Sequence, residues 1–181
     1  MAAMAITDNM DFSIIAAVDN QGGLAKNGQM PWQLPGELKY FKAITIGTGH
    51  NAVIMGRKTW QTLPEKNQPL KNRLNVILSR QDNLSLPKRV IQFSSLDQAL
   101  NDLKQKNLDR VFVIGGGEVF KEAVNHKSCS NIYLTKISQN FNCDIFMPKI
   151  DKNFKLEKQS QLVEESGLSY CFLTFTRSKS R

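Results

Sequence analysis

The sequence has few of the residues that build disulfide frameworks and metal sites. It contains three cysteines, Cys129, Cys143 and Cys171, far apart in the chain, and only two histidines, His50 and His126. An odd number of widely spaced cysteines predicts neither a disulfide framework nor a zinc knuckle. We therefore expect no bound metal, and we expect a reducing compartment, which for this chain means the cytoplasm.

Long apolar runs and a secretory leader are also missing. No apolar stretch of the sequence approaches the length of a membrane span. Residues 1–6 have neither a basic region nor a long apolar core, so they are not expected to be a secretory signal. These absences predict a soluble protein that needs no membrane, with residues 1–10 as a flexible segment ahead of the first strand.

The charge of the chain is basic but scattered. There are 24 Lys and Arg residues against 16 Asp and Glu residues, which gives a net charge of +8. This excess favours anionic partners, such as nucleic acid, a membrane surface, or small phosphates and carboxylates. A basic nucleic-acid-binding protein would also need clustered cations and exposed aromatic side chains. Because only the tail at residues 178–181 is densely basic, we expect no nucleic-acid partner.

The pattern of apolar segments predicts a single α/β domain over residues 11–177. A chain of 181 residues that is 41% hydrophobic, without repeats or linkers, suits one domain with a sizeable core. Strand patterns alternate with helical patterns early in the chain and two strand patterns come late. We expect a mainly parallel central β-sheet flanked by helices, with a C-terminal antiparallel hairpin. The expected strands cover residues 12–18, 52–55, 75–78, 90–91, 111–114, 131–137, 154–156 and 168–176, and the expected helices begin near residues 36, 57, 96 and 118.

Glu37 lies on the apolar face of the helix that is predicted to begin after Pro35. Its neighbours three before, four after and seven after are Leu34, Phe41 and Ile44, whereas the lysines of this segment fall on another side. A carboxylate in apolar surroundings has a raised pKa, and it can carry a proton near neutral pH or anchor a cationic or hydrogen-bonding ligand. The alternative is an ordinary first-turn acid favoured by the helix dipole.

The loop over residues 19–30 precedes this helix. Its G-x-x-x-x-G spacing from Gly23 to Gly28 resembles a phosphate loop, but Gln29 stands where that motif needs lysine. We interpret the loop as a mobile cover over a site, with an ordinary surface loop as an equal alternative.

Two predicted strand ends carry cations and a hydroxyl. One strand ends at Gly56 and continues into Arg-Lys-Thr at residues 57–59, and another ends at Ser79 and Arg80. The carboxyl ends of neighbouring parallel strands meet at one edge of a sheet, so these groups predict a phosphate pocket. Solvated surface cations are the alternative.

A run of three glycines at residues 115–117 joins an apolar strand to a helix. Close backbone approach and a helix N-terminus are the features of a diphosphate cradle. The Rossmann fingerprint is not met, because Phe120 occupies its last position. A tight structural turn is the alternative, although three glycines exceed what a turn needs.

Together, these motifs resemble the dihydrofolate reductase family. They occur in the family's order and spacing from about Phe12 to Arg177, and the Glu in the acid position and the segment 64–70 are similar to eukaryotic members. The motifs that carry the resemblance are Met30-Pro31-Trp32, Leu34-Pro35, Glu37, residues 53–60, Pro69-Leu70, Arg73, residues 77–80, residues 114–117, residues 133–135, Asp144 and Pro148.

The resemblance implies an NADPH-dependent reduction of 7,8-dihydrofolate to tetrahydrofolate, with hydride transfer to C6 and protonation at N5, and binding of antifolate-type inhibitors. It also implies a cis peptide between the first two of the three glycines. The implied catalytic residues are Glu37, Thr135 and Trp32, and the implied substrate-binding residues are Leu38, Phe41, Leu70, Arg73 and Ile114. The implied NADPH-binding residues are Ala17, Leu24, Met30, Gly56, Arg57, Lys58, Thr59, Ser79, Arg80, Gly115, Gly116, Gly117, Glu118, Val119 and Phe120. We expect a monomer.

The chain departs from the family pattern in three places. Ala25 stands where glycine is usual in the mobile loop, Phe120 stands where tyrosine is usual, and the residues between Asp144 and Pro148 vary. None of these departures removes a group that is implied in the chemistry. The alternative enzyme is another NADPH-dependent reductase of the same fold that acts on a riboflavin precursor, and the combination of Glu37 with Arg73 argues against it.

Overall fold

The computed structural model describes residues 10–178 of the chain. The segment predicted to be flexible, residues 1–10, and the basic tail, residues 178–181, lie almost wholly outside the described residues. Within residues 10–178, no helix is long and apolar enough to cross a membrane. The same range holds no group of three or more His, Cys, Asp or Glu side chains that could bind a metal ion.

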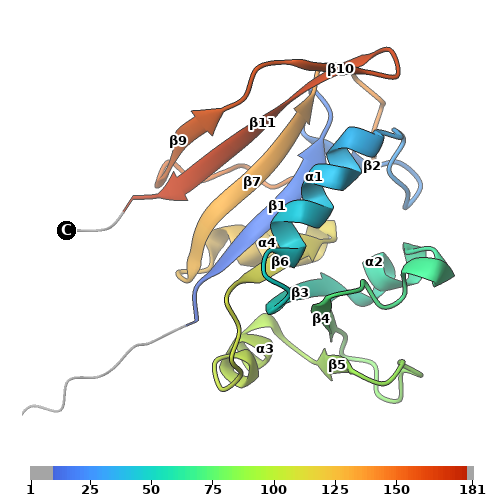
Figure 1. Cartoon of the computed structure of the whole chain (residues 1–181), viewed down its shortest axis with the longest axis vertical. Helices are drawn as coiled ribbons and strands as arrows, with labels where there is room; N and C mark the ends of the chain where they lie inside the picture. The colour runs from blue at the N-terminus through green and yellow to red at the C-terminus, as the bar shows by residue number, and fades with distance from the viewer. Residues whose placement is uncertain (1–9, 179–181) are drawn as a thin grey trace, which may run out of the picture.

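Nine strands of the described chain form one mainly parallel sheet, as predicted (Figure 1). Its order is β10-β11-β7-β1-β6-β3-β4-β5, and β9 also pairs with β11. The pairs from β7 through β1, β6, β3 and β4 to β5 are parallel, whereas β11 runs antiparallel to β7, β9 and β10. The bounds are β1 Phe12–Val18, β3 Asn51–Gly56, β4 Arg73–Leu78, β5 Val90–Phe93, β6 Val111–Gly115, β7 Cys129–Ile137, β9 Phe154–Gln159, β10 Val163–Glu165 and β11 Leu168–Arg177.

Helices cover both faces of the sheet because the central strands are apolar on both sides. Ile14 of β1 belongs to a buried cluster with α3 (Leu96–Leu103) and α4 (Gly117–Asn125). Its neighbour Ile15 packs on the other face, in a cluster that includes residues of α1 (Pro35–Ile46) and α2 (Arg57–Thr62). A short 3-10 helix, Glu65–Asn67, follows α2. Figure 1 shows α1 in front of the sheet, running alongside β1.

The two predicted late strands, β9 and β11, pair antiparallel as expected, but a further strand that was not predicted lies between them in the chain. The connection between the two predicted late strands contains β10, which pairs antiparallel with the start of β11. The turn between them uses Ser166 and Gly167, both with positive φ angles, 53° and 75°. β10 is short and carries two glutamates, so its sequence has little strand propensity and its pairing with β11 decides its conformation. A second short strand pair, β2 (Gly23–Ala25) and β8 (Ile145–Phe146), was not predicted either.

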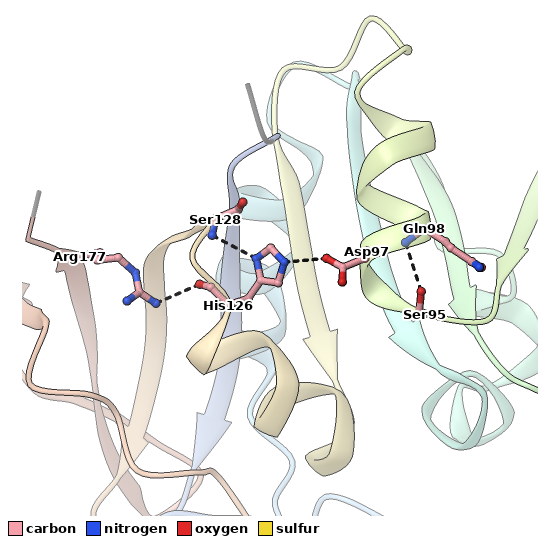
Figure 2. A network of polar contacts seen from close by, with 6 residues as sticks. All are labelled: Ser95, Asp97, Gln98, His126, Ser128 and Arg177. Atoms are coloured by element: carbon pink, nitrogen blue, oxygen red, sulfur yellow. Dashed lines mark hydrogen bonds and ion pairs between the residues drawn. The ribbon is translucent and has the colours of Figure 1, made fainter. Parts of the chain in front are cut away.

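A polar network around His126 joins α3, the end of α4 and β11 (Figure 2). His126 Nε2 lies 3.0 Å from Asp97 Oδ1, and its Nδ1 accepts the backbone N–H of Ser128 at 3.1 Å. Arg177 donates to the carbonyl of His126 at 3.1 Å. His126 ends α4 three residues before β7 begins, so the network lies at the amino edge of the parallel strands. The predicted phosphate-binding groups at residues 57–59 and 79–80 instead follow the carboxyl ends of β3 and β4.

Candidate functional site

The carboxylate of Glu37 is buried between α1 and the sheet. The side chain is 5% exposed, and Thr135 of β7 donates a hydrogen bond from Oγ1 to Glu37 Oε1 at 3.3 Å. Burial raises the pKa of the Glu37 carboxyl above its ordinary value of 4.5, and the hydrogen bond from Thr135 offsets part of that rise. Lys39 and Lys42 are exposed. The predicted placement of one carboxylate on an apolar face, away from the lysines of its helix, is therefore confirmed.

Aromatic rings surround this end of α1. Trp32 is 5% exposed and packs edge-on against Phe141, with ring centroids 5.4 Å apart. The indole N–H of Trp32 is buried and has no hydrogen-bond acceptor among residues 10–178. One turn into the helix, Tyr40 stacks on Phe172 of β11 with centroids 3.9 Å apart. Buried donors are normally satisfied, so the free indole N–H marks a place where a bound molecule or water could accept.

Three of the residues implied in substrate binding pack together. Phe41 of α1 and Ile114 of β6 are partly buried against the cluster that contains Leu70, which is itself 9% exposed. Leu38, next to Glu37, is 51% exposed. The structure thus brings an exposed apolar side chain and a buried apolar cluster to the two sides of the helix that carries Glu37.

Arg73 reaches from β4 to the opposite end of α1. Its Nη1 donates to Thr45 Oγ1 at 2.8 Å, and its Nε donates to the carbonyl of Lys71 at 3.0 Å. Partial burial lowers the pKa of Arg73 below its usual range, although the guanidinium stays charged. Asn75 fixes the chain before this strand, because its side chain accepts from the N–H of Leu70 and donates to its carbonyl, both at 2.9 Å. Sequence analysis missed both Thr45 and Asn75.

The two predicted cationic strand ends are neighbours. β3 and β4 pair in parallel with Gly56 opposite Leu78, so the Arg-Lys-Thr of residues 57–59 and the pair Ser79-Arg80 follow adjacent strands. Ser79 and Arg80 line an open cavity of about 500 Å³. The other residues lining it are Asp82, Asn83, Gln92, Phe93, Ser94 and Gln98. On the α2 side, Lys58 is exposed and Arg57 donates to Gln61 at 2.9 Å.

Gly116 and Gly117 are packed too closely for side chains, and Gly115 has a positive φ angle of 129° that disfavours one. The Gly115–Gly116 peptide is cis, as the family resemblance implied. A Cβ on Gly116 would lie 2.9 Å from Thr59 Oγ1, and one on Gly117 would lie 2.8 Å from Ile145 Cγ2. Gly56 lies beside this glycine run, since a Cβ added to it would lie 3.1 Å from Val119 Cγ2. The end of β3, the start of α2 and the start of α4 therefore meet at bare backbone.

The side chains that follow these glycines point elsewhere. Glu118 is largely exposed and pairs with Lys121 at 2.6 Å, and this pairing lowers the pKa of the Glu118 carboxyl. Phe120 is 3% exposed and belongs to the core on the α3–α4 face. The edge of the Phe120 ring lies against Gly115, 3.5 Å from the position of a Cβ there.

The loop over residues 19–30 is held to the chain around residue 144. Asp19 is fully buried and accepts the N–H groups of Gly23, Gln21 and Phe141 at 2.7, 2.9 and 3.1 Å. Farther along, Asp144 Oδ2 accepts from the N–H of Asn27 at 2.8 Å. Ala17 and Leu24 are partly buried, whereas Met30 is 54% exposed.

The departure at Ala25 is compatible with this loop. Ala25 lies in β2, and its carbonyl accepts the N–H of Asp144 at 2.9 Å. Positive φ angles occur nearby at Gly22, Asn27 and Gly28, but not at Ala25. The backbone at this position therefore does not require glycine.

Comparison with known proteins identifies relatives over nearly the whole chain. The sequence profile described as dihydrofolate reductase matches residues 11–177. The dihydrofolate reductases of Aedes albopictus and Heliothis virescens are 38% and 37% identical to the chain; the first alignment covers 92% of this chain and 97% of the mosquito protein, and the second covers 91% and 95%.

A bifunctional plant protein is also similar. Bifunctional dihydrofolate reductase-thymidylate synthase 1 of Arabidopsis thaliana is 42% identical over 180 residues, which cover 93% of this chain and 35% of the plant protein. The chain thus spans about a third of the length of this bifunctional relative and nearly all of the insect relatives.

Proposed function

Because the chain belongs to the dihydrofolate reductase family, we propose that it reduces 7,8-dihydrofolate to 5,6,7,8-tetrahydrofolate with NADPH. The observation that carries this proposal is the buried carboxylate of Glu37, whose pKa is raised and which accepts a hydrogen bond from the hydroxyl of Thr135 on the sheet. A carboxyl group with a raised pKa can bind the amino group and ring nitrogen of a pterin and can supply a proton near neutral pH.

The residues around Glu37 suit the rest of such a substrate. Leu38 and Phe41 on α1, with Leu70 and Ile114, supply apolar contacts for flat rings. Arg73 has a planar guanidinium suited to a carboxylate, which in dihydrofolate is the α-carboxylate of the glutamate tail. The free indole N–H of Trp32 can hold a water or a ring atom near Glu37. These roles are the ones that the family resemblance implies, and the placement of the side chains supports them.

The residues at the carboxyl edge fit NADPH. The bare backbone at Gly56, Gly115 and Gly116 permits a close approach by a diphosphate. Arg80 and Ser79, at the 500 Å³ cavity, and the cations Arg57 and Lys58 after β3 would hold the adenosine half with its 2′-phosphate. When bound, NADPH supplies the hydride. Met30 and the loop held by Asp19 would cover the nicotinamide side and exclude water from it.

The proposal includes the setting of the enzyme. All three cysteines are buried free thiols, which suits a reducing compartment such as the cytoplasm. We propose a monomer that binds antifolate-type inhibitors at the Glu37 site. Neither the relatives nor the site favours a riboflavin precursor as the substrate.

Absorbance assays of NADPH oxidation test the activity. We expect a rapid loss that requires dihydrofolate and is slower with NADH. Glu37→Gln should lower kcat by about 10² to 10⁴, the usual contribution of general acid catalysis. Glu122→Gln, on the exposed face of α4, is the matched control and should keep full activity. Oxidation that does not depend on dihydrofolate, or full activity of Glu37→Gln at neutral pH, would contradict the proposal.

A further inference from the structure

The first turn of α1 is capped by a carboxylate from a distant strand. The residue before the helix is Leu34, whose apolar side chain cannot accept a hydrogen bond from the first helical N–H groups. Glu165 of β10 takes this role: the N–H of Gly36 donates to Oε1 at 2.9 Å and to Oε2 at 3.0 Å. A charged acceptor at a helix N-terminus is also favoured by the helix dipole. Figure 1 shows β10 and the amino-terminal end of α1 at the same end of the sheet.

Tyr170 orients this carboxylate from β11. Its phenol is 1% exposed and donates to Glu165 Oε2 at 3.1 Å. Burial, together with the neighbouring Glu165, raises the pKa of Tyr170 to about 12, so the phenol remains a donor at all pH values in which the enzyme would work. Glu165 is therefore fixed on one side by Tyr170 and on the other by Gly36.

Gly36 is required for this contact. A Cβ at residue 36 would lie 2.6 Å from Tyr170 Oη, closer than real Cβ atoms come, and 3.0 Å from Glu165 Oε2, which is also tight. The helix can approach the two side chains only because residue 36 has no side chain. This close approach and the bidentate hydrogen bond are separate observations that point to the same device.

The capped turn is the one that carries Glu37. Glu37 follows Gly36 directly, and Thr135, its hydrogen-bond donor, lies on β7 opposite Phe172 of β11. Phe172 stacks on Tyr40 of α1. The strand β11 thus borders both the donor to Glu37 and the helix that carries Glu37. Glu165, held by Tyr170 of β11, joins this strand to the residue before Glu37.

We propose that Glu165 is a positioning residue for Glu37, which sets the depth at which the Glu37 carboxylate is buried against Thr135. The inference rests on the proposed function, because Glu37 is the proton-linked group there. Without Glu165, the first turn loses its acceptor and frays, and water reaches Glu37. The titratable groups that face Glu37 are Tyr40 on its own helix and Tyr170 on β11, with Glu165 beyond Tyr170 and Tyr133 beyond Tyr40.

The test separates positioning from simple stabilisation. The pKa of Glu37 is measured by ¹³C NMR of its carboxyl carbon, and hydride transfer is measured by stopped flow across pH, in wild type, Glu165→Ala and Glu165→Gln. We expect Glu165→Ala to lower the pKa of Glu37 by about one unit, which lowers hydride transfer about tenfold at a pH above that pKa. Glu165→Gln keeps one acceptor oxygen for Gly36, so it should fall between wild type and Glu165→Ala.

Two controls lie outside this contact. Glu164→Gln changes the neighbouring carboxylate of β10, which instead accepts from the Ser169 hydroxyl. Arg177→Ala removes hydrogen bonds to three backbone carbonyls at the other end of β11 and should lower stability without reaching Glu37. Both should leave the pKa of Glu37 and the pH profile unchanged.

The outcomes are distinct. A lower melting temperature in Glu165→Ala and in Glu165→Gln with an unchanged Glu37 pKa would overturn the proposal, since a purely structural cap predicts that result. If wild type does not reduce dihydrofolate, the proposed function fails, but the NMR titration still decides the positioning role. If Glu165→Ala does not fold, Glu165→Gln decides it alone.

Discussion

The hydroxyl of Thr135 on β7 donates to the carboxylate of Glu37 on α1 across 3.3 Å, and both side chains are almost fully buried. This hydrogen bond favours the charged form of Glu37, while burial disfavours it, and burial is the larger effect. The protonation of the buried carboxyl therefore depends on a contact between two residues that are 98 positions apart.

Replacing Thr135 by valine should raise the pKa of Glu37 further. Valine keeps the shape of threonine but cannot donate, so the carboxylate loses the one interaction that lowers its pKa. We expect the free energy of unfolding at pH 7 to fall by about 1.5–3 kcal/mol, the usual contribution of a hydrogen bond to a charged group. Carboxyl NMR and urea unfolding measure the two effects. Thr174→Val on β11, whose hydroxyl forms no hydrogen bond within the described chain, should change neither; an unmoved Glu37 pKa in Thr135→Val would show that the hydroxyl does not act on it.

The stability of Glu37→Gln should depend on pH in a defined direction. The pKa of Glu37 is raised on folding, so the native state favours the protonated form, and this stabilisation is complete below the unfolded value near 4.5. It is lost as pH rises through the native pKa, whereas glutamine does not titrate. The difference in unfolding free energy between Glu37→Gln and wild type should therefore increase from pH 4 upward and then level off. The total increase should be about 1.4 kcal/mol per unit by which folding raises the pKa of Glu37. Denaturant unfolding at several pH values measures this, and a difference that does not change with pH would contradict it.

Asp19→Asn should behave in the opposite sense. Burial acts to raise the pKa of Asp19, but hydrogen bonds from the N–H groups of Phe141, Gly23 and Gln21 and from Cys143 together lower it. The carboxylate therefore stabilises the fold above its ordinary value of 3.8, and this contribution is lost as pH falls through the lower native value. We expect Asp19→Asn to cost about 1–3 kcal/mol near neutral pH and less below pH 4. Asp11→Asn, at an exposed carboxylate, should cost little at either pH, and equal costs for Asp19→Asn at both would count against this account.

The sequence was sufficient for features that repeat along one element. The spacing of Leu34, Phe41 and Ile44 around Glu37 predicted its burial, because helical periodicity alone decides which face a residue shares. Likewise, the order of apolar runs predicted the parallel strands and hence the adjacency of the ends of β3 and β4. The cis peptide at Gly115–Gly116 came from the family resemblance, not from any local pattern.

The features that were missed depend on contacts between distant parts of the chain. Nothing near Glu165 in the sequence shows that it caps α1, since its partner Gly36 is 129 residues away. Asp19 was predicted only as the first residue of the loop over residues 19–30, and the fold brings Phe141 to it. The short strands β2, β8 and β10 are too polar or too brief to be recognised, and they form because a partner strand is already in place.

Replacing Arg80 should change the preference between NADPH and NADH. Arg80 is exposed at the cavity that it lines with Ser79, where we propose that the 2′-phosphate binds. Loss of a charge-assisted hydrogen bond, at about 1.5–3 kcal/mol, weakens NADPH binding about 10- to 100-fold. Arg80→Gln should raise the Kd for NADPH by that factor and leave NADH unaffected, as measured by fluorescence titration. Lys88→Gln, at an exposed lysine that does not line the cavity, is the control, and an equal loss for both cofactors in Arg80→Gln would place the 2′-phosphate elsewhere.

Gly117→Ala should couple the glycine run to β8. The added Cβ would lie 2.8 Å from Ile145 Cγ2, so Ile145 and its pairing with β2 must shift. We expect a loss of about 1–3 kcal/mol in unfolding free energy, the usual cost of overpacking, together with weaker NADPH binding. Ile145→Ala removes the clashing methyl group. Gly117→Ala should therefore cost much less unfolding free energy when it is added to Ile145→Ala than when it is added to wild type. Residues in direct contact give interaction energies of about 0.5–3 kcal/mol in such a cycle. Additive effects of the two substitutions would mean that the Cβ is accommodated without moving β8, and the loop that β8 holds would then be independent of the glycine run.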